Sequence, residues 1–152
     1  MAATPQKKKK SVFVQGAIDS SFIGDSIAKH QSKTTIGAHQ IFLGQVRSDV
    51  IDKKTVVAID YSAYEDMAEK QFAKIREAAF EKFDLVCLHI YHSIGIVKMG
   101  EICLFVFVSA AHRKASYDGL QFIVEEIKAN VPIFGKEVFE DDSYSWKVNV
   151  NK

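Results

Sequence analysis

Two apolar segments constrain the fold of this chain more than any other feature. They run from Leu85 to His92 and from Ile102 to Ala110, and both are rich in β-branched and aromatic residues. Short runs of this composition predict strands that are buried inside the protein. Gly95 and Gly100 lie between the two runs and are expected to mark the connection that joins the strands.

Three further segments have the spacing or the boundary residues of helices. Asp19, Ser20 and Ser21 are typical N-cap residues and predict a helix that runs to about Lys29. Apolar residues predict a second helix over residues 66–83, with one face formed by Met67, Ala68, Phe72, Ile75, Ala79 and Phe83. A third helix is expected from Lys114 to Pro132, with an apolar side formed by Leu120, Ile123, Val124, Ile127 and Val131.

The remaining apolar stretches predict shorter strands. One covers residues 12–15, and the strands over 37–46 and 55–64 resemble the arms of a hairpin with a long polar tip. Gly44 is expected to mark a bulge or a close approach of another group to the backbone. Two short strands follow, around 135–139 and 143–149. The resulting order predicts an α+β fold in which helices pack on a mostly antiparallel sheet.

Length and charge indicate one folded domain with a basic tail. The 152 residues are 47% apolar, which is enough for a single domain over residues 11–152. Lys7 to Lys10 contribute +4 to a net charge of +1, so the rest of the chain carries −3. Residues 1–10 are therefore expected to be a disordered tail. An RNA-binding domain with this tail as an arm is an alternative, but an acidic remainder does not favour contact with nucleic acid.

The two cysteines and the lengths of the apolar runs bear on the compartment. Cys87 and Cys103 lie inside the apolar segments, and two cysteines are too few for a disulfide scaffold or a cysteine-based metal site. No stretch reaches the ~18 apolar residues of a membrane span. Residues 1–10 lack the apolar core of a secretory signal. A cytoplasmic protein without a membrane partner is expected.

Cationic residues near helix ends are the main candidates for a binding site. His112 and Arg113 follow a buried strand and lie at the expected start of a helix, where free N–H groups also favour an anion. Solvated residues at an element boundary are the alternative interpretation. Lys128 lies in the last turn of that helix and Lys136 follows Pro132, positions where lysines are common because of the helix dipole.

No motif for a metal or a nucleotide is present in the sequence. The histidines of the expected strands, His39, His89 and His92, lack the spacing of metal ligands and are interpreted as packing or hydrogen-bonding residues. We therefore expect neither a metal site nor a cofactor.

Five motifs follow one another over roughly residues 35–147. They are Phe42-Leu-Gly-Gln-Val-Arg47, Tyr61-Ser-Ala-Tyr-Glu-Asp-Met67, His92-Ser-Ile-Gly-Ile-Val-Lys-Met-Gly-Glu101, Ser109-Ala-Ala-His-Arg113 and Lys128-Ala-Asn-Val-Pro-Ile-Phe134. In combination, they resemble the motifs of the large, catalytic subunit of molybdopterin synthase, the MoaE family.

This resemblance implies an α/β-hammerhead-type fold and a homodimer with a small ubiquitin-like subunit at each end, a heterotetramer. It also implies that the partner's C-terminal Gly-Gly thiocarboxylate delivers sulfur to cyclic pyranopterin monophosphate, which builds the dithiolene of molybdopterin. The implied catalytic residues are Lys128 and Lys136. The implied substrate-binding residues are Gln45, Val46, Arg47, His112, Arg113, Lys128, Gly135, Lys136 and Glu137.

The phosphate of that substrate suits a clamp of Arg47, His112 and Arg113, because arginine offers a fixed fork of donors to an anion. Lys128 is expected to reach the same anion and to stabilise the oxyanion of the thiocarboxylate.

One position departs from the family pattern. The family usually has a lysine of the active site where this chain has Gly135. We expect Lys136 to replace that lysine, because glycine gives the backbone freedom to redirect the next side chain. Otherwise the site depends on Lys128, with reduced activity. The alternative is a non-catalytic interaction module of the same fold that binds a ubiquitin-like partner without turnover.

Overall fold

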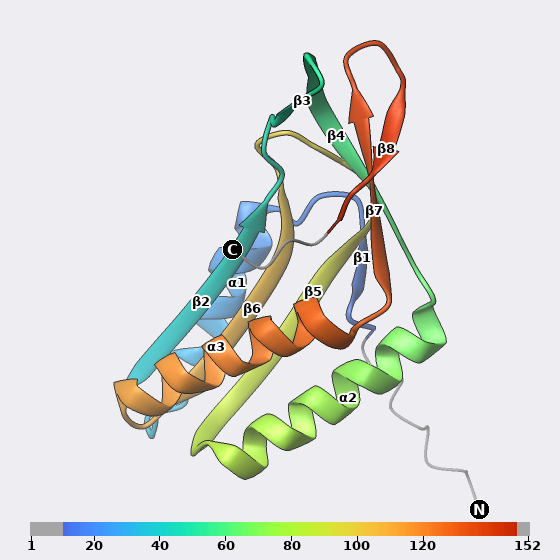
Figure 1. The fold of residues 1–152 in the computed structure, drawn as a ribbon. Coiled ribbons are helices and arrows are strands. Elements are labelled where there is room, and N and C mark those ends of the chain that lie inside the picture. Colours follow the sequence, from blue (N-terminus) through green and yellow to red (C-terminus); the bar gives the residue numbers. More distant parts are fainter. Residues whose placement is uncertain (1–10, 149–152) are drawn as a thin grey trace, which may run out of the picture.

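The computed structural model describes residues 11–148, which form three helices and eight strands (Figure 1). The expected basic tail, residues 1–10, lies outside the described residues. The elements are β1 (Phe13–Gln15), α1 (Ser20–His30), β2 (Ala38–Gln45), β3 (Val50–Ile51), β4 (Lys54–Ala63), α2 (Glu65–Lys82), β5 (Leu85–Lys98), β6 (Ile102–Ala110), α3 (Arg113–Asn130), β7 (Ile133–Phe139) and β8 (Tyr144–Trp146).

The eight strands form one sheet in the order β2-β6-β5-β4-β7-β8. Neighbours on this path are antiparallel, β1 pairs in parallel with β5, and β3 pairs with β4. In Figure 1, α2 and α3 cover one face of the sheet and α1 covers the other. The predicted α+β class, with helices on a mostly antiparallel sheet, is confirmed.

Strand β6 contributes side chains to both layers because alternate residues of a strand point to opposite faces. Leu104, Val106 and Val108 belong to the large core beneath α2 and α3. Phe105 and Phe107 belong to a smaller core beneath α1. All five side chains are buried, which confirms the prediction of an interior strand over this segment.

The helices lie close to their predicted positions. The Asp19 carboxylate accepts a hydrogen bond from the Ser21 N–H at 2.9 Å, so it caps α1 as expected. Pro132 follows the end of α3 at Asn130. Met67 is a wrong prediction, since its side chain is 59% exposed while the adjacent Ala68 faces the core. One helical position turns a side chain by about 100°, and at this point of the helix the turn carries Met67 out of the face that Ala68 presents to the core.

Strand β5 is longer than predicted and continues through Gly95 to Lys98. Its first half pairs with β6, and its last part pairs with β4. Gly95 has φ +86°, and a Cβ there would lie 2.4 Å from the side-chain nitrogen of Gln15. The glycine therefore allows one strand to pass from one partner to the next rather than ending it.

The hairpin predicted between residues 37–46 and 55–64 is wrong. Strand β2 pairs with β6, whereas β4 pairs with β5 and β7. The actual hairpin is short and local: β3 pairs with the start of β4 around Asp52 and Lys53, which both have positive φ. Two such residues form the tight turn that matches the twist of paired strands.

The bulge expected at Gly44 is confirmed, because the register between β2 and β6 shifts between Gly44 and Gln45. A Cβ on Gly44 would lie 3.1 Å from the Cβ of Leu104, so the glycine also permits a close approach of the strands. Among the described residues, no helix combines the length and apolar character needed to cross a membrane.

Candidate active site

A cavity of about 410 Å³ opens where α3 ends against the sheet. Lys128 enters it from the last turn of α3, while Tyr61 of β4 and His92 of β5 line its wall. Gly135 of β7 and Lys147, which follows β8, complete the polar part of the lining. A larger cavity, about 500 Å³ beside Phe72, Arg76 and Tyr91, is lined by none of the predicted site residues.

Two lysines share the cavity because of the pairing of β7 with β8. Lys136 pairs with Trp146, which places Lys147 beside Gly135, and the Lys147 N–H donates to the Gly135 carbonyl oxygen at 2.8 Å. The Cβ of Lys147 lies 3.7 Å from the position that a Cβ on Gly135 would occupy. Because Gly135 has no side chain, a space remains beside the strand at this position. Lys147 lies next to that space.

The environment of Lys128 lowers its pKa. Burial of the ammonium group is the largest cause, the nearby Cys103 thiol opposes it, and the positive charge of Lys147 adds to it. The side chain of Lys128 still reaches solvent at the mouth of the cavity. A lysine in this setting gives up its proton more readily than a free lysine does.

Two neutral groups form the wall behind the lysines. Burial lowers the pKa of His92 to about 4, and its Nδ1–H donates to the Ser93 carbonyl oxygen at 2.8 Å. Burial also raises the pKa of Tyr61, whose ring meets that of His92 edge-on at 5.1 Å between centroids. At neutral pH the wall therefore carries no charge.

The side chain of Lys136 points away from the cavity. This direction does not support the expectation that Lys136 replaces the lysine missing at position 135. Gly135 and Glu137 share one face of β7, so Lys136 between them lies on the other face. Its ammonium lies 4.5 Å from the centroid of the Tyr144 ring, outside the cavity lining. Glu137 is buried, and its charge helps to raise the pKa of Tyr61.

Sequence reasoning missed Lys147, although the predicted terminal strands contain a signal for it. An antiparallel pairing of those strands across the turn at 140–143 places position 147 opposite position 135. Composition and motif spacing give no register for such a pairing. The place of Lys147 in the site can therefore be inferred only when the register of the two strands is known.

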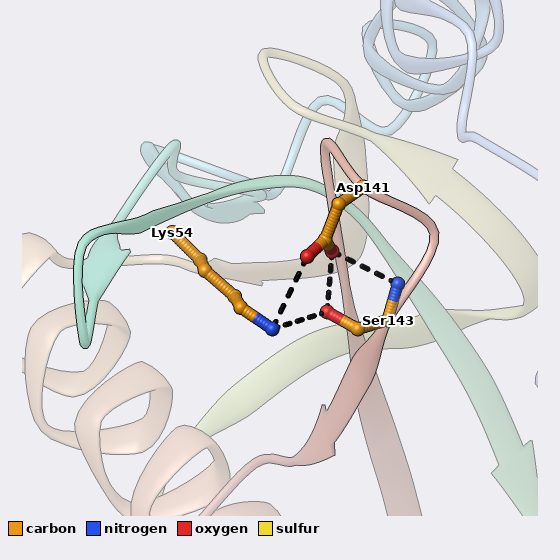
Figure 2. A network of polar contacts seen from close by, with 3 residues as sticks. All are labelled: Lys54, Asp141 and Ser143. Atoms are coloured by element: carbon orange, nitrogen blue, oxygen red, sulfur yellow. Dashed lines mark hydrogen bonds and ion pairs between the residues drawn. The ribbon is translucent and has the colours of Figure 1, made fainter.

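A polar network holds the β7–β8 turn against β4 (Figure 2). The ammonium of Lys54 lies 3.2 Å from an Asp141 carboxylate oxygen and donates to the Ser143 hydroxyl at 3.0 Å. The Ser143 N–H and hydroxyl both donate to Asp141, and these bonds lower the pKa of Asp141 to about 2. The network fixes the turn from which β8 delivers Lys147.

The predicted substrate-binding residues at the end of β2 differ in exposure. Arg47 is exposed, and its guanidinium forms an ion pair with Asp49 at 3.2 Å. Gln45 is exposed beside it. Val46 is 1% exposed, and its N–H and carbonyl oxygen pair with Glu101 and Gly100. The backbone groups of Val46 are therefore engaged within the fold, and its role in substrate binding stays a prediction.

The predicted clamp of Arg47, His112 and Arg113 does not assemble within one chain. His112 and Arg113 are exposed at the start of α3, whereas Lys128 is fifteen residues further along, roughly 22 Å at 1.5 Å per residue. Arg47 lies beyond the end of β6 at Ile102, and His112 lies beyond the other end at Ala110, roughly 26 Å away. The anion site expected from three neighbouring cations is wrong as a site of a single copy.

Comparisons with known proteins agree with this fold. Residues 18–130 match the family model described as MoaE protein. Three relatives are named molybdopterin synthase catalytic subunit. The protein from Pyrococcus abyssi is 37% identical over 122 residues, 80% of this chain and 81% of that protein. The one from Bacillus subtilis is 38% identical over 117 residues, 77% and 74% of the two chains. The bovine one is 34% identical over 125 residues, 82% of this chain.

The chain spans 66% of the bovine relative and 56% of the rat relative.

Among solved structures, molybdopterin synthase from Staphylococcus aureus matches with a TM-score of 0.78 and 29% identity, over 93% of this chain and 98% of that one. A chain from the complex of subunits 1 and 2 of the Helicobacter pylori molybdopterin-converting factor, 22% identical with a TM-score of 0.75 over 88% and 87% of the chains, shares the fold. On the family model and these relatives, the chain belongs to the MoaE family.

Proposed function

We propose that this chain is the catalytic subunit of a molybdopterin synthase. It would transfer sulfur from the C-terminal glycine thiocarboxylate of a small ubiquitin-like subunit to cyclic pyranopterin monophosphate. The observation that carries the proposal is the convergence of Lys128 and Lys147 on one cavity, beside the neutral His92 and Tyr61.

The charges of this cavity suit the two reactants. A thiocarboxylate and a phosphate are both anions, and two ammonium groups beside an uncharged wall attract both. The thiocarboxylate sulfur bonds to a carbon of the substrate and displaces an oxygen substituent, which leaves as water. A second water then attacks the acyl carbon of the resulting thioester, negative charge develops on the acyl oxygen, and the acyl C–S bond breaks to leave a carboxylate on the partner and a thiolate on the product. An ammonium already in place stabilises that charge. Lys128, with its lowered pKa, also becomes an effective proton donor.

A second copy of the chain completes the site in this proposal. His112 and Arg113 are exposed and lie roughly 22 Å from Lys128 of their own chain. They therefore cannot meet an anion held by that lysine, but a homodimer can bring them to the cavity of the other copy. Arg47 lies at the cavity end of β6 in its own chain and is available there. No cofactor takes part, and a cytoplasmic site of action belongs to the same proposal.

The test is reconstitution of the reaction. The full chain is incubated with a thiocarboxylated small subunit and cyclic pyranopterin monophosphate, and molybdopterin is measured. Lys128→Ala is expected to lower turnover by roughly 10²–10⁴-fold, the range of a lost acid or oxyanion contact. Lys136→Ala is the matched control, because that ammonium lies over the Tyr144 ring. Partner binding without turnover by the unchanged chain would instead identify a non-catalytic interaction module.

A further inference from the structure

Three potential metal ligands meet on the α1 face of the sheet, away from the lysine cavity. His30 is the last residue of α1, and Cys87 and His89 are two positions apart in β5. One ligand atom from each residue lies within 4.8 Å of the others. His89 pairs with Phe107 and His92 pairs with Leu104, so the two histidines of β5 face opposite layers. The cluster is therefore distinct from the proposed active site.

The ring of His30 is oriented as metal-binding imidazoles are. Its Nδ1 lies 2.6 Å from the Ser26 carbonyl oxygen, which can only accept, so Nδ1 carries the proton. Nε2 then presents a lone pair toward the centre of the cluster, 2.9 Å from Nε2 of His89. A backbone carbonyl that fixes the tautomer of a histidine in this way is the usual second contact of a metal ligand.

The third ligand of the cluster is Cys87. Cys87 is buried and free of any disulfide, and the ammonium of Lys33 lies 2.9 Å from its sulfur. Metals bind the thiolate form of cysteine, and the Lys33 ammonium lies where its charge can offset that of the sulfur once the ion is bound. The rings of His30 and His89 both contact the buried Phe107 ring, which limits their movement.

We propose that His30, Cys87 and His89 form a binding site for a thiophilic divalent transition-metal ion of the Zn²⁺ class. Bonds of about 2.0–2.1 Å to nitrogen and 2.3 Å to sulfur in a tetrahedron require these ligand atoms to be roughly 3.3–3.6 Å apart. The observed separations reach this range with side-chain shifts of about 1 Å or less. Two imidazoles and one thiolate leave a fourth position for water. Motif spacing does not reveal this site, because His30 and Cys87 come from segments far apart in the chain.

The test uses Co²⁺ as a spectroscopic probe of the full chain after treatment with a chelator. We expect one ion per chain, with the thiolate-to-cobalt charge-transfer absorption of a cysteine ligand and the intense visible bands of a tetrahedral ion. Cys87→Ser should abolish the charge-transfer absorption, and His89→Gln should weaken binding at least tenfold. Zn²⁺ should displace Co²⁺ and raise the melting temperature of the unchanged chain.

Two control variants separate this site from other groups. His39→Gln alters a ring that also stacks on Phe107 but is not among the three ligands. Cys103→Ser removes the other thiol. Both should retain the charge-transfer absorption. Its absence from the unchanged chain overturns the proposal even if the Cys87 variant does not fold, as does Co²⁺ binding that persists in both ligand variants. Because sulfur transfer is not measured, the outcome is independent of the proposed function.

Discussion

At the scale of single residues, the neutral state of His92 links the cavity wall to stability. The pKa of His92 is about 4 in the folded chain, against 6.5 for a free histidine. Between these values the unfolded chain binds the proton and the folded chain does not. The free energy of unfolding should therefore fall by up to roughly 3 kcal/mol as the pH decreases from 6.5 to 4.

Urea denaturation of the unchanged chain and of His92→Asn at pH 7 and pH 4.5 measures this effect. Asparagine retains a donor for the Ser93 carbonyl oxygen but does not titrate. The difference in unfolding free energy between the two pH values should be smaller in the variant by most of that amount. Equal differences would mean that His92 is not the group responsible.

The second prediction concerns Lys147. Lys147→Ala should lower turnover about ten- to a hundredfold, because it removes one of two charges that face the anions. It also removes a repulsion, so the pKa of Lys128 should rise and the alkaline limb of the rate profile should move to higher pH. A shift of this limb distinguishes an electrostatic role from a loss of structure.

Gly135→Lys in the Lys147→Ala background is the matching rescue. A Cβ at position 135 would lie 3.0 Å from the Ile59 side chain, so a small adjustment of that side chain admits the new lysine. Partial recovery of turnover is expected. Unchanged turnover in Lys147→Ala alone would remove this residue from the site.

Residue type and spacing predicted only part of this site. Lys128 was predictable because its position depends on one helix and the proline that ends it. Lys136 was wrongly expected to turn inward, because the face of a strand residue depends on the pairing of its neighbours. Lys147 and the cluster at His30 were invisible to motif spacing, because both arise from contacts between separate elements.

At the scale of elements, the β7–β8 turn should control how firmly Lys147 is held. Asp141→Asn removes the charge that attracts Lys54 and weakens the bonds from Ser143. Amide hydrogen exchange at Lys147, whose N–H bonds to Gly135, is expected to become faster. Asp142→Asn changes the adjacent carboxylate, and asparagine tolerates the positive φ of that position. Similar exchange rates in both variants would contradict the role of the network.

The elements themselves were predicted well and their partners were not. Capping residues located α1, and apolar patterns located α2, α3 and the buried strands, because each of these signals lies within one segment. The pairing of β2 with β6 is not predictable from the order of the strands, because strands adjacent in the sequence favour a hairpin. The Asp52-Lys53 turn occupies the place where that hairpin was expected, and it joins only β3 to β4.

At the scale of the whole molecule, the separation of Arg113 from Lys128 makes a prediction about assembly. Arg113→Ala and Lys128→Ala should each be nearly inactive alone. If the site forms between two copies, a mixed dimer contains one cavity with both residues intact. Mixing the variants at equal amounts and allowing exchange should then restore about a quarter of the normal turnover. Light scattering should show that the mixture contains dimers. If turnover still does not recover, the two residues do not act together across two copies of the chain.

The division of β6 between two cores has a consequence for how the molecule comes apart. Phe105 and Phe107 lie under α1, whereas Leu104, Val106 and Val108 lie under α2 and α3. The strand cannot leave one layer without leaving the other. Detachment of α1 would expose Phe105 and Phe107 to water, so the burial of these two rings opposes opening of that layer by itself.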